Sequence, residues 1–236
     1  LDNSISTGNG VFIKRASRAC IPPTLLAELL LRHAKEYGDS VSTLQERFQL
    51  ANSIAQQKQS IEHTFYSGFK LPSSLVRSVH KQLDSPIVIA IVRDPRDTFV
   101  SQKSRGMVNS ISGFCSNWSG FVKQVSRGQQ KGDIHLVIRY EDLVTSLQDE
   151  IDKIALLLQL KSTDEMRLFY KSKASIHSPG QRHVNADELS KDVFSTKIGR
   201  WKEETSPEDV KGIEKRCYKE MNRFGYSTEH DIKAPW

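Results

Sequence analysis

Residues 87–101 restrict the possible folds of this chain more than any other stretch. They open with a run of β-branched and small apolar residues that continues to Val92. A run of this kind is typical of a strand buried on both faces, as in the parallel sheets of α/β proteins. Asp94 and Pro95 follow, and these residue types are favoured at the N-cap and the first position of a helix. The stretch therefore predicts a strand, a sharp turn and a helix, with Arg93 at the carboxyl end of the strand.

The predicted turn has the chemistry of an anion-binding site. A helix N-terminus offers free N–H groups, and ligands of open α/β sheets bind at the carboxyl ends of the strands. Arg93 and Arg96 add forked donors that match phosphate oxygens. Ser101 lies roughly 9 Å along the helix, so its hydroxyl and the Arg93 guanidinium can meet on one phosphate. The alternative interpretation is a capped helix whose arginines pair with Asp94, Asp97 or solvent.

The remaining patterns alternate between helices and strands. Strands separated by helices imply right-handed crossovers, so the sequence predicts an α/β fold with a mainly parallel central sheet flanked by helices. The last helix carries an apolar stripe and ends at Gly225, where we expect left-handed backbone. The predicted segments are helices at 24–38, 43–63 and 74–83, a strand at 65–70, a flexible piece at 106–113, a helix at 114–128, a strand at 134–139, a helix at 140–158, and a final helix that starts at Ser206 and buries Val210, Ile213, Cys217 and Met221.

The sequence contains two further candidate site segments. Tyr140 follows the 134–139 strand directly, and Glu141 and Asp142 come next. Acids favour the first turn of a helix, and we interpret both carboxylates in that way. Residues 172–200 are irregular and rich in Ser, Lys and His, and a long loop of this kind is usually functional or disordered.

The composition favours a small anionic partner. A formal charge of +6 and a pI of about 9.2 suit an anion, but basic and acidic residues are interspersed and no dense Lys/Arg block occurs, so we expect no nucleic acid.

The three cysteines are far apart, which argues against a disulfide framework and against a Cys-rich metal site. No apolar run reaches the length that a bilayer requires. A cytoplasmic protein is the simplest interpretation, with the Golgi lumen as the alternative if an anchor precedes Leu1.

Three stretches, in the same order along the chain, resemble the sulfotransferases that use 3′-phosphoadenosine 5′-phosphosulfate (PAPS). Arg93, followed eight positions later by Ser101, resembles their 3′-phosphate-binding segment. Residues 137–144 and 198–202, with 224–226 closing the last helix, resemble two later motifs. The resemblance covers residues 67 to 226 and implies a P-loop NTPase-like fold. It further implies a single domain over 1–236, with a helical part at 1–66, the core at 67–226 and a tail at 227–236.

The resemblance also implies roles for individual residues. Arg93 and Ser101 would hold the 3′-phosphate, and Tyr140 would lie against the adenine. The family's next segment folds over the nucleotide, and its matching residues here are Lys197, Gly199 and Arg200. Cytosolic members carry an Arg-Lys-Gly triplet slightly earlier, which this chain lacks.

The catalytic residues are less well defined. The family's N-terminal loop with Ser-Gly-Thr-Thr, which holds the 5′-phosphosulfate, is not found, and neither is the phosphate loop of ATPases and kinases. We interpret this as a sequence that starts downstream of the loop, and the alternative is a degenerate member. Lys70 resembles a site residue of bacterial and Golgi members, although it also suits a solvated strand end. Side chains able to act as a base are His33, Glu62 and His63, but such residues on amphipathic helices more often serve packing or solvation.

The sequence therefore predicts a sulfotransferase that moves a sulfonyl group from PAPS to a hydroxyl or amine of an unknown acceptor, with no metal. The alternative is a non-catalytic protein of the same fold that binds a nucleotide or a partner. Neither the acceptor nor the oligomeric state is indicated by the sequence.

Overall fold

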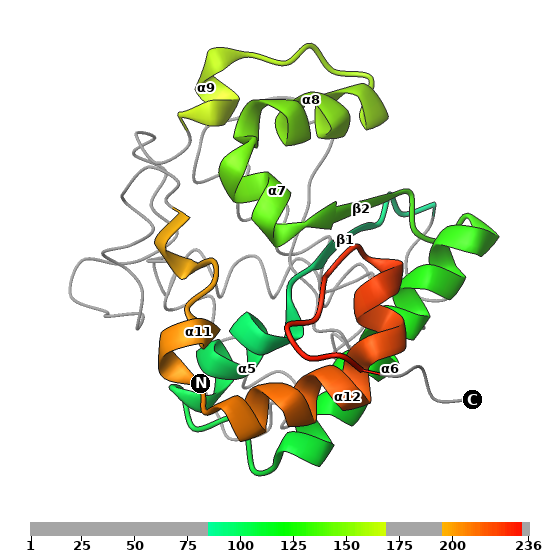
Figure 1. Ribbon diagram of the computed structural model, residues 1–236. Helices are drawn as coiled ribbons and strands as arrows, with labels where there is room; N and C mark the ends of the chain where they lie inside the picture. Colours follow the sequence, from blue (N-terminus) through cyan, green and yellow to red (C-terminus); the bar gives the residue numbers. More distant parts are fainter. Residues whose placement is uncertain (1–84, 169–194, 233–236) are drawn as a thin grey trace, which may run out of the picture. The chain divides into compact units, whose positions relative to one another are not determined.

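The computed structural model describes residues 85–168 and 195–232 (Figure 1). The predicted elements at 24–38, 43–63, 65–70 and 74–83 lie outside these ranges, and so do the candidates His33, Glu62, His63 and Lys70. The described elements are β1 (Ile89–Val92), α5 (Pro95–Lys103), α6 (Ile111–Lys131), β2 (Leu136–Arg139), α7 (Tyr140–Thr145), α8 (Leu147–Leu157), α9 (Asp164–Arg167), the short 3₁₀ helix η3 (Ser195–Lys197), α11 (Trp201–Glu204) and α12 (Pro207–Arg223).

Strands β1 and β2 pair in parallel, which confirms the predicted α/β arrangement in this part of the chain. The register places Ile89 opposite Leu136 and Val92 opposite Arg139, and α5 and α6 form the connection between the strands. Because the strands are parallel and in this register, both end at the same edge of the sheet. The residues that follow them, Arg93 and Tyr140, therefore start from neighbouring positions.

The prediction that the first strand is buried on both faces is wrong. Ala90 and Val92 are buried, whereas Ile91 is 50% exposed. Successive side chains of a strand point to opposite faces of the sheet, so Ala90 and Val92 share the core face and Ile91 points to the other. The uniformly apolar sequence of the strand gave no sign of this difference.

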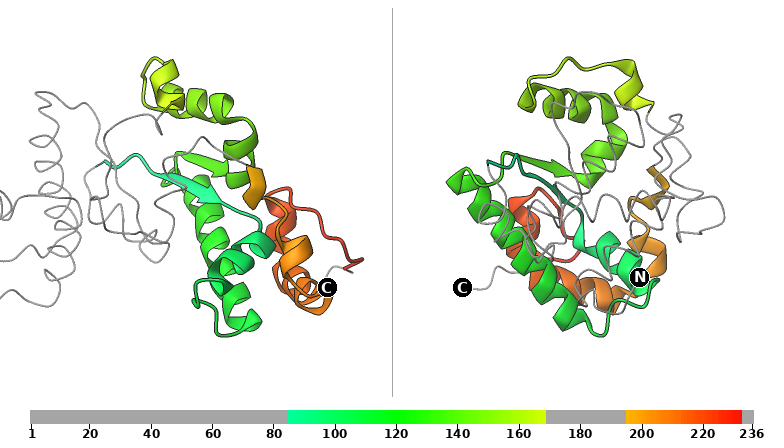
Figure 2. Two further views of the ribbon diagram at one scale, coloured as in Figure 1. Left: turned by 90° about the vertical axis from the view of Figure 1, so that its left-hand side faces the viewer. Right: turned by 180° about the vertical axis from the view of Figure 1, so that it is seen from behind.

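The core lies largely between α6 and α12, which pack side by side (Figures 1 and 2). Burying one large aliphatic or aromatic side chain contributes roughly 1.5–3 kcal/mol, so this contact is a main source of stability. The predicted stripe of α12 is confirmed, since all four of its residues are buried. The buried apolar side chains of the two helices are Phe114, Cys115, Trp118, Val122 and Val125 from α6 and Val210, Ile213, Cys217 and Met221 from α12.

The predicted limits of α6 require two corrections. The flexible piece was predicted to reach Gly113, but the Ser110 side chain accepts a hydrogen bond from the Gly113 N–H and starts the helix at Ile111. The helix was predicted to end by Gly128, but it continues to a left-handed cap at Gly132, with φ 79°. Close packing, and not a helix end, explains the glycine at position 128. A Cβ there would lie 2.9 Å from two atoms of the Ile134 side chain.

Helix caps position the elements around β1. Asp94 caps α5 by accepting from the Arg96 N–H, with Pro95 next, as predicted. Ser206 caps α12, and Gly225 has φ 73°, which confirms the expected left-handed backbone. The predicted helix 140–158 is divided at Ser146, whose φ −134° and ψ 50° lie outside the helical region, so that α7 and α8 are separate.

Neither a membrane-spanning helix nor a group of metal-binding side chains occurs in residues 85–168 and 195–232. None of the helices placed there combines the length and the apolar character of a membrane span. Within the same ranges, no cluster of His, Cys, Asp and Glu side chains is suited to holding a metal ion.

Candidate functional site

Arg93 connects three segments at the shared end of β1 and β2. Its guanidinium lies over the Tyr140 ring, with the central carbon 4.3 Å from the ring centroid. Its Nη2 donates to the backbone carbonyl of Lys197, and its own carbonyl accepts from the Trp118 indole at 3.0 Å. Its Nε is buried and has no hydrogen-bond partner in the described part of the chain. A buried donor on a charged group is costly to leave unpaired, so Arg93 has unused capacity to bind an anion.

Asp97 holds the segment that contains Lys197, whose carbonyl accepts from Arg93. Its carboxylate is almost fully buried and accepts from the N–H of Gly199 at 2.7 Å and the N–H of Trp201 at 3.1 Å. Gly199 has φ 77°, a left-handed conformation that glycine adopts without strain. Burial raises the pKa of Asp97, although the two backbone hydrogen bonds oppose the rise. We call residues 197–201 the closing segment; Asp97 ties it to α5.

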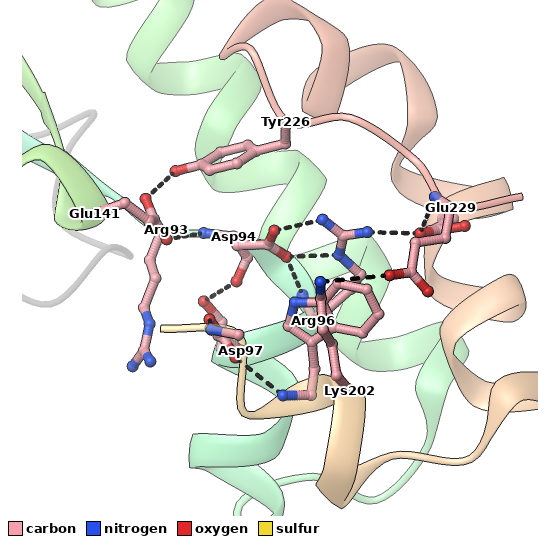
Figure 3. A network of polar contacts seen from close by, with 12 residues as sticks. Arg93, Asp94, Arg96, Asp97, Glu141, Lys202, Tyr226 and Glu229 are labelled. Carbon is pink, nitrogen blue, oxygen red and sulfur yellow. Dashed lines mark hydrogen bonds and ion pairs between the residues drawn. The ribbon is translucent and has the colours of Figure 1, made fainter. Parts of the chain in front are cut away.

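Arg96 is a structural residue, so the prediction that it adds donors to an anion is wrong. Its side chain is buried, and its Nε and Nη2 donate to Asp94 at 3.0 and 2.7 Å while Nη1 donates to Glu214 at 2.6 Å (Figure 3). The guanidinium also stacks on Trp201, 4.0 Å from a ring centroid. Burial alone would lower the pKa of Arg96, but the two carboxylates outweigh it and raise the pKa. Three of its five N–H groups donate within the protein, and the side chain is buried among these partners, which favours a structural role.

Glu214 is the second buried acid that pairs with Arg96. It accepts from the backbone N–H of Glu229 at 2.9 Å, from the N–H of His230 at 3.1 Å, and lies 2.7 Å from His230 Nδ1. Burial alone would raise the pKa of Glu214, but these hydrogen bonds and that of Arg96 hold it below its ordinary value. At the surface of the same corner, Lys202 pairs with Glu229 at 3.8 Å.

Glu141 joins the two strand ends to the C-terminal segment. It lies in the first turn of α7, as predicted, but its side chain does more than favour that helix. One oxygen accepts from the Asp94 N–H at 3.0 Å, and the other accepts from the Tyr226 hydroxyl at 2.9 Å. Burial raises the pKa of Tyr226, and the neighbouring Glu141 charge adds to the rise. Glu141 thus fixes the β1–α5 turn from the adjacent strand.

Two predicted site residues have partners of their own. The Ser101 hydroxyl accepts from Arg105 Nη2 at 2.6 Å, and within the described ranges no hydrogen bond joins it to Arg93. Arg200 donates from Nε and Nη2 to the two oxygens of Glu204, both at 2.7 Å. The arrangement at the end of the strands therefore comes from Arg93, Tyr140 and the closing segment, with Ser101 further along α5.

The chain is similar to a known protein family over most of its length. A family model described as a sulfotransferase domain matches residues 36–225. The chain belongs to the sulfotransferase family. The match begins upstream of residue 67, where the resemblance was expected to start, and no curated protein matches the chain.

In this member of the sulfotransferase family, two carboxylates organise the site, and the sequence had suggested other roles for them: Glu141 as an acid at a helix start, and Asp97 as a partner of an arginine in the alternative interpretation. Asp97 lies in the first turn of α5, four positions after Arg93 and four before Ser101, a spacing that places it on the same helix face as Ser101. That spacing could have indicated that Asp97 belongs to the same site as Ser101, but nothing in it indicates the contact with the closing segment. The partner of Glu141, Tyr226, lies 85 positions away, and no local pattern indicates it.

Proposed function

We propose that this protein transfers a sulfonyl group from PAPS to a hydroxyl or amine, and that the shared end of β1 and β2 binds the nucleotide part of the donor. The observation that carries the proposal is Arg93. Its buried Nε has no partner in residues 85–168 and 195–232, while its guanidinium stacks on Tyr140 and reaches the closing segment. Sulfonyl transfer is the family's general activity. The parallel strands with helical connections agree with a P-loop NTPase-like fold, which is part of the proposal.

The proposed binding mode gives each described residue a physical task. Arg93 pairs with the 3′-phosphate because a guanidinium fork matches phosphate oxygens. Ser101 adds a hydroxyl donor from α5. Since Arg93 covers one face of the Tyr140 ring, adenine stacks against the remaining surface of that ring. Lys197, Gly199 and Arg200 belong to the segment that closes over the nucleotide, and Arg200 exchanges Glu204 for the ligand.

The described residues support the reaction by positioning. In sulfonyl transfer, a new S–O bond to the acceptor forms while the S–O bond to the leaving phosphate breaks, and the acceptor hydroxyl gives its proton to a base. Holding the adenine and the 3′-phosphate fixes the donor so that the sulfur faces the acceptor. The proposal leaves the catalytic group among Lys70, His63 and His33, which lie outside the described residues.

Calorimetric titration with adenosine 3′,5′-bisphosphate and with 5′-AMP tests the binding mode, because the two ligands differ only in the 3′-phosphate. We expect the bisphosphate to bind at least about tenfold more tightly, the size of one charge-assisted contact. Arg93→Ala should remove this preference, whereas Arg127→Ala, an exposed arginine on α6, should keep it. Equal binding of both ligands to the unmodified protein would overturn the proposal.

Transfer itself needs a second measurement. Incubation with PAPS and a panel of hydroxyl and amine acceptors, followed by mass spectrometry, should detect a sulfated product that Arg93→Ala forms more slowly. Binding of the bisphosphate with no transfer to any acceptor would instead favour a non-catalytic nucleotide-binding protein of the same fold.

A further inference from the structure

The end of α12 determines where the Tyr226 side chain lies. The Gly225 N–H donates to the Asn222 carbonyl at 3.1 Å, and the Tyr226 N–H donates to the Met221 carbonyl at 2.9 Å. This pair of hydrogen bonds around a left-handed glycine is the Schellman motif of helix C-termini. The motif turns the chain back toward the sheet, so that the buried Tyr226 side chain points to the strand ends (Figure 3).

On the β2 side, the Tyr226 side chain contacts both chain neighbours of Tyr140. The Arg139 guanidinium lies over the Tyr226 ring, with its central carbon 4.6 Å from the ring centroid. A Glu141 oxygen accepts from the Tyr226 hydroxyl at 2.9 Å. Burial raises the pKa of Tyr226, so this hydroxyl keeps its proton at neutral pH. Contacts with a single side chain therefore hold the backbone before and after Tyr140.

On the β1 side, the same hydroxyl reaches the chain neighbours of Arg93. The Val92 carbonyl accepts from the Tyr226 hydroxyl at 3.3 Å and shares its one hydrogen with Glu141. The other Glu141 oxygen accepts from the Asp94 N–H at 3.0 Å. The residues before and after Arg93 are thus both linked to Tyr226, one directly and the other through Glu141.

The pairing of the strands does not itself fix the residues that follow them. The register ends with Val92 opposite Arg139, and Arg93 and Tyr140 are the next residues along each strand. Past this pair, side chains must replace the ladder hydrogen bonds if the two strand ends are to keep a fixed spacing. The contacts of Tyr226 supply such a link.

We propose that Tyr226 is a positioning residue of the nucleotide site, which sets the spacing between Arg93 and Tyr140. The inference rests on the proposed function, because it takes Arg93 as the partner of the 3′-phosphate and Tyr140 as the partner of adenine. Adenine and the 3′-phosphate are attached to one ribose, so the spacing of the two side chains decides whether both contacts form together. Fixing this spacing before the ligand arrives lowers the cost of binding.

The test measures the preference for adenosine 3′,5′-bisphosphate over 5′-AMP by calorimetric titration. Tyr226→Phe removes the hydroxyl and keeps the ring, and Tyr218→Phe, at a half-buried tyrosine of α12, is the matched control. The preference is a ratio of two affinities that both require folded protein. Partial unfolding lowers the two affinities equally and leaves the ratio unchanged, so a purely structural role of Tyr226 would not alter it.

We expect Tyr226→Phe to reduce the preference about fivefold, the size of one lost hydrogen bond. Tyr218→Phe should keep the full preference. When Arg93→Ala is already present, Tyr226→Phe should cause no further reduction, because Tyr226 acts on the preference through Arg93. Thermal unfolding of each variant identifies a temperature at which all of them are folded.

Three results would overturn the inference. If Tyr226→Phe weakens both ligands equally, its hydroxyl only supports the fold, and if it weakens neither, the hydroxyl does not position the site. If the double variant loses more preference than Arg93→Ala alone, Tyr226 does not act through Arg93. Failure of the proposed function gives a different pattern, in which the unmodified protein shows no preference or Arg93→Ala leaves the preference unchanged.

Discussion

The two sides of the β1–α5 turn use the same residue types for opposite purposes. Asp94 and Arg96 turn toward α12, where buried opposite charges pair with one another and with Glu214. Arg93 and Asp97 turn toward the closing segment. Among the residues that the structure describes, the Arg93 Nε has no hydrogen-bond partner, and Asp97 accepts only from backbone N–H groups. Figure 3 shows the Arg93 side chain extending away from the Arg96 cluster. The first side fixes the turn through its buried ion pairs, and the second is the side on which we propose that a ligand binds.

The buried carboxylates of the two sides show this difference in their pKa values. The pKa of Glu214 is lowered, so its stabilising contribution is present above its ordinary value of 4.5 and is lost as the pH falls through the folded pKa. The pKa of Asp97 is raised, so its contribution is complete below 3.8 and declines as the pH rises through the folded pKa. Of these two carboxylates, Glu214 therefore adds to acid sensitivity and Asp97 does not.

Glu214→Gln should have the largest effect, because it leaves the Arg96 charge buried with one partner fewer. Removing one member of a buried ion pair typically costs about 3–5 kcal/mol. We expect a matching decrease in the free energy of unfolding in urea at pH 7, and a smaller difference from the unmodified protein below pH 4.5. Glu208→Gln, an exposed acid in the first turn of the same helix, should cost less than about 1 kcal/mol. Equal losses in both variants would contradict the assigned role of Glu214.

Asp97→Asn should act locally, on the closing segment. An amide oxygen can accept from one of the two N–H groups, but the amide nitrogen then faces the other. Leaving one N–H unpaired costs about 1–3 kcal/mol, so the amides of Gly199 and Trp201 should exchange with solvent roughly ten- to a hundredfold faster. Hydrogen exchange followed by mass spectrometry measures this, with peptides from α6 as the internal control. Unchanged protection at 199–201 would show that Asp97 does not hold the segment.

Gly199→Ala should have the smallest effect of the three. A Cβ at this position meets nothing within 4 Å, so the cost comes only from the φ of 77° and should be roughly 1–2 kcal/mol. Thermal unfolding measures the loss. Gly120→Ala in the middle of α6 is the matched control, since its Cβ also meets nothing and alanine favours a helix there. The two substitutions should change stability in opposite directions. A stabilising Gly199→Ala would show that alanine is not strained at the φ of this position.

Local patterns predicted the elements around the site but not how their side chains pair. Asp94, Pro95 and Ser206 are cap residues whose preference depends on a few neighbours, and the structure confirms them. The structural role of Arg96 depends on Glu214, which lies 118 positions away. Nothing near Arg96 in the sequence distinguishes it from Arg93. Gly128 was interpreted as a helix end because glycine is common there, whereas contact with Ile134 explains its size. Pairing and close packing between distant segments are properties that a local pattern does not contain.

The hydrogen bonds of the C-terminal segment also bear on where a shortened version of this protein could be cut. The family match ends at residue 225, yet the Tyr226 hydroxyl on Glu141 and the Glu229 and His230 N–H groups on Glu214 all lie beyond it. An expression clone trimmed to the match would strip those donors from two acids that support the β1–α5 turn. A boundary placed after His230 keeps them.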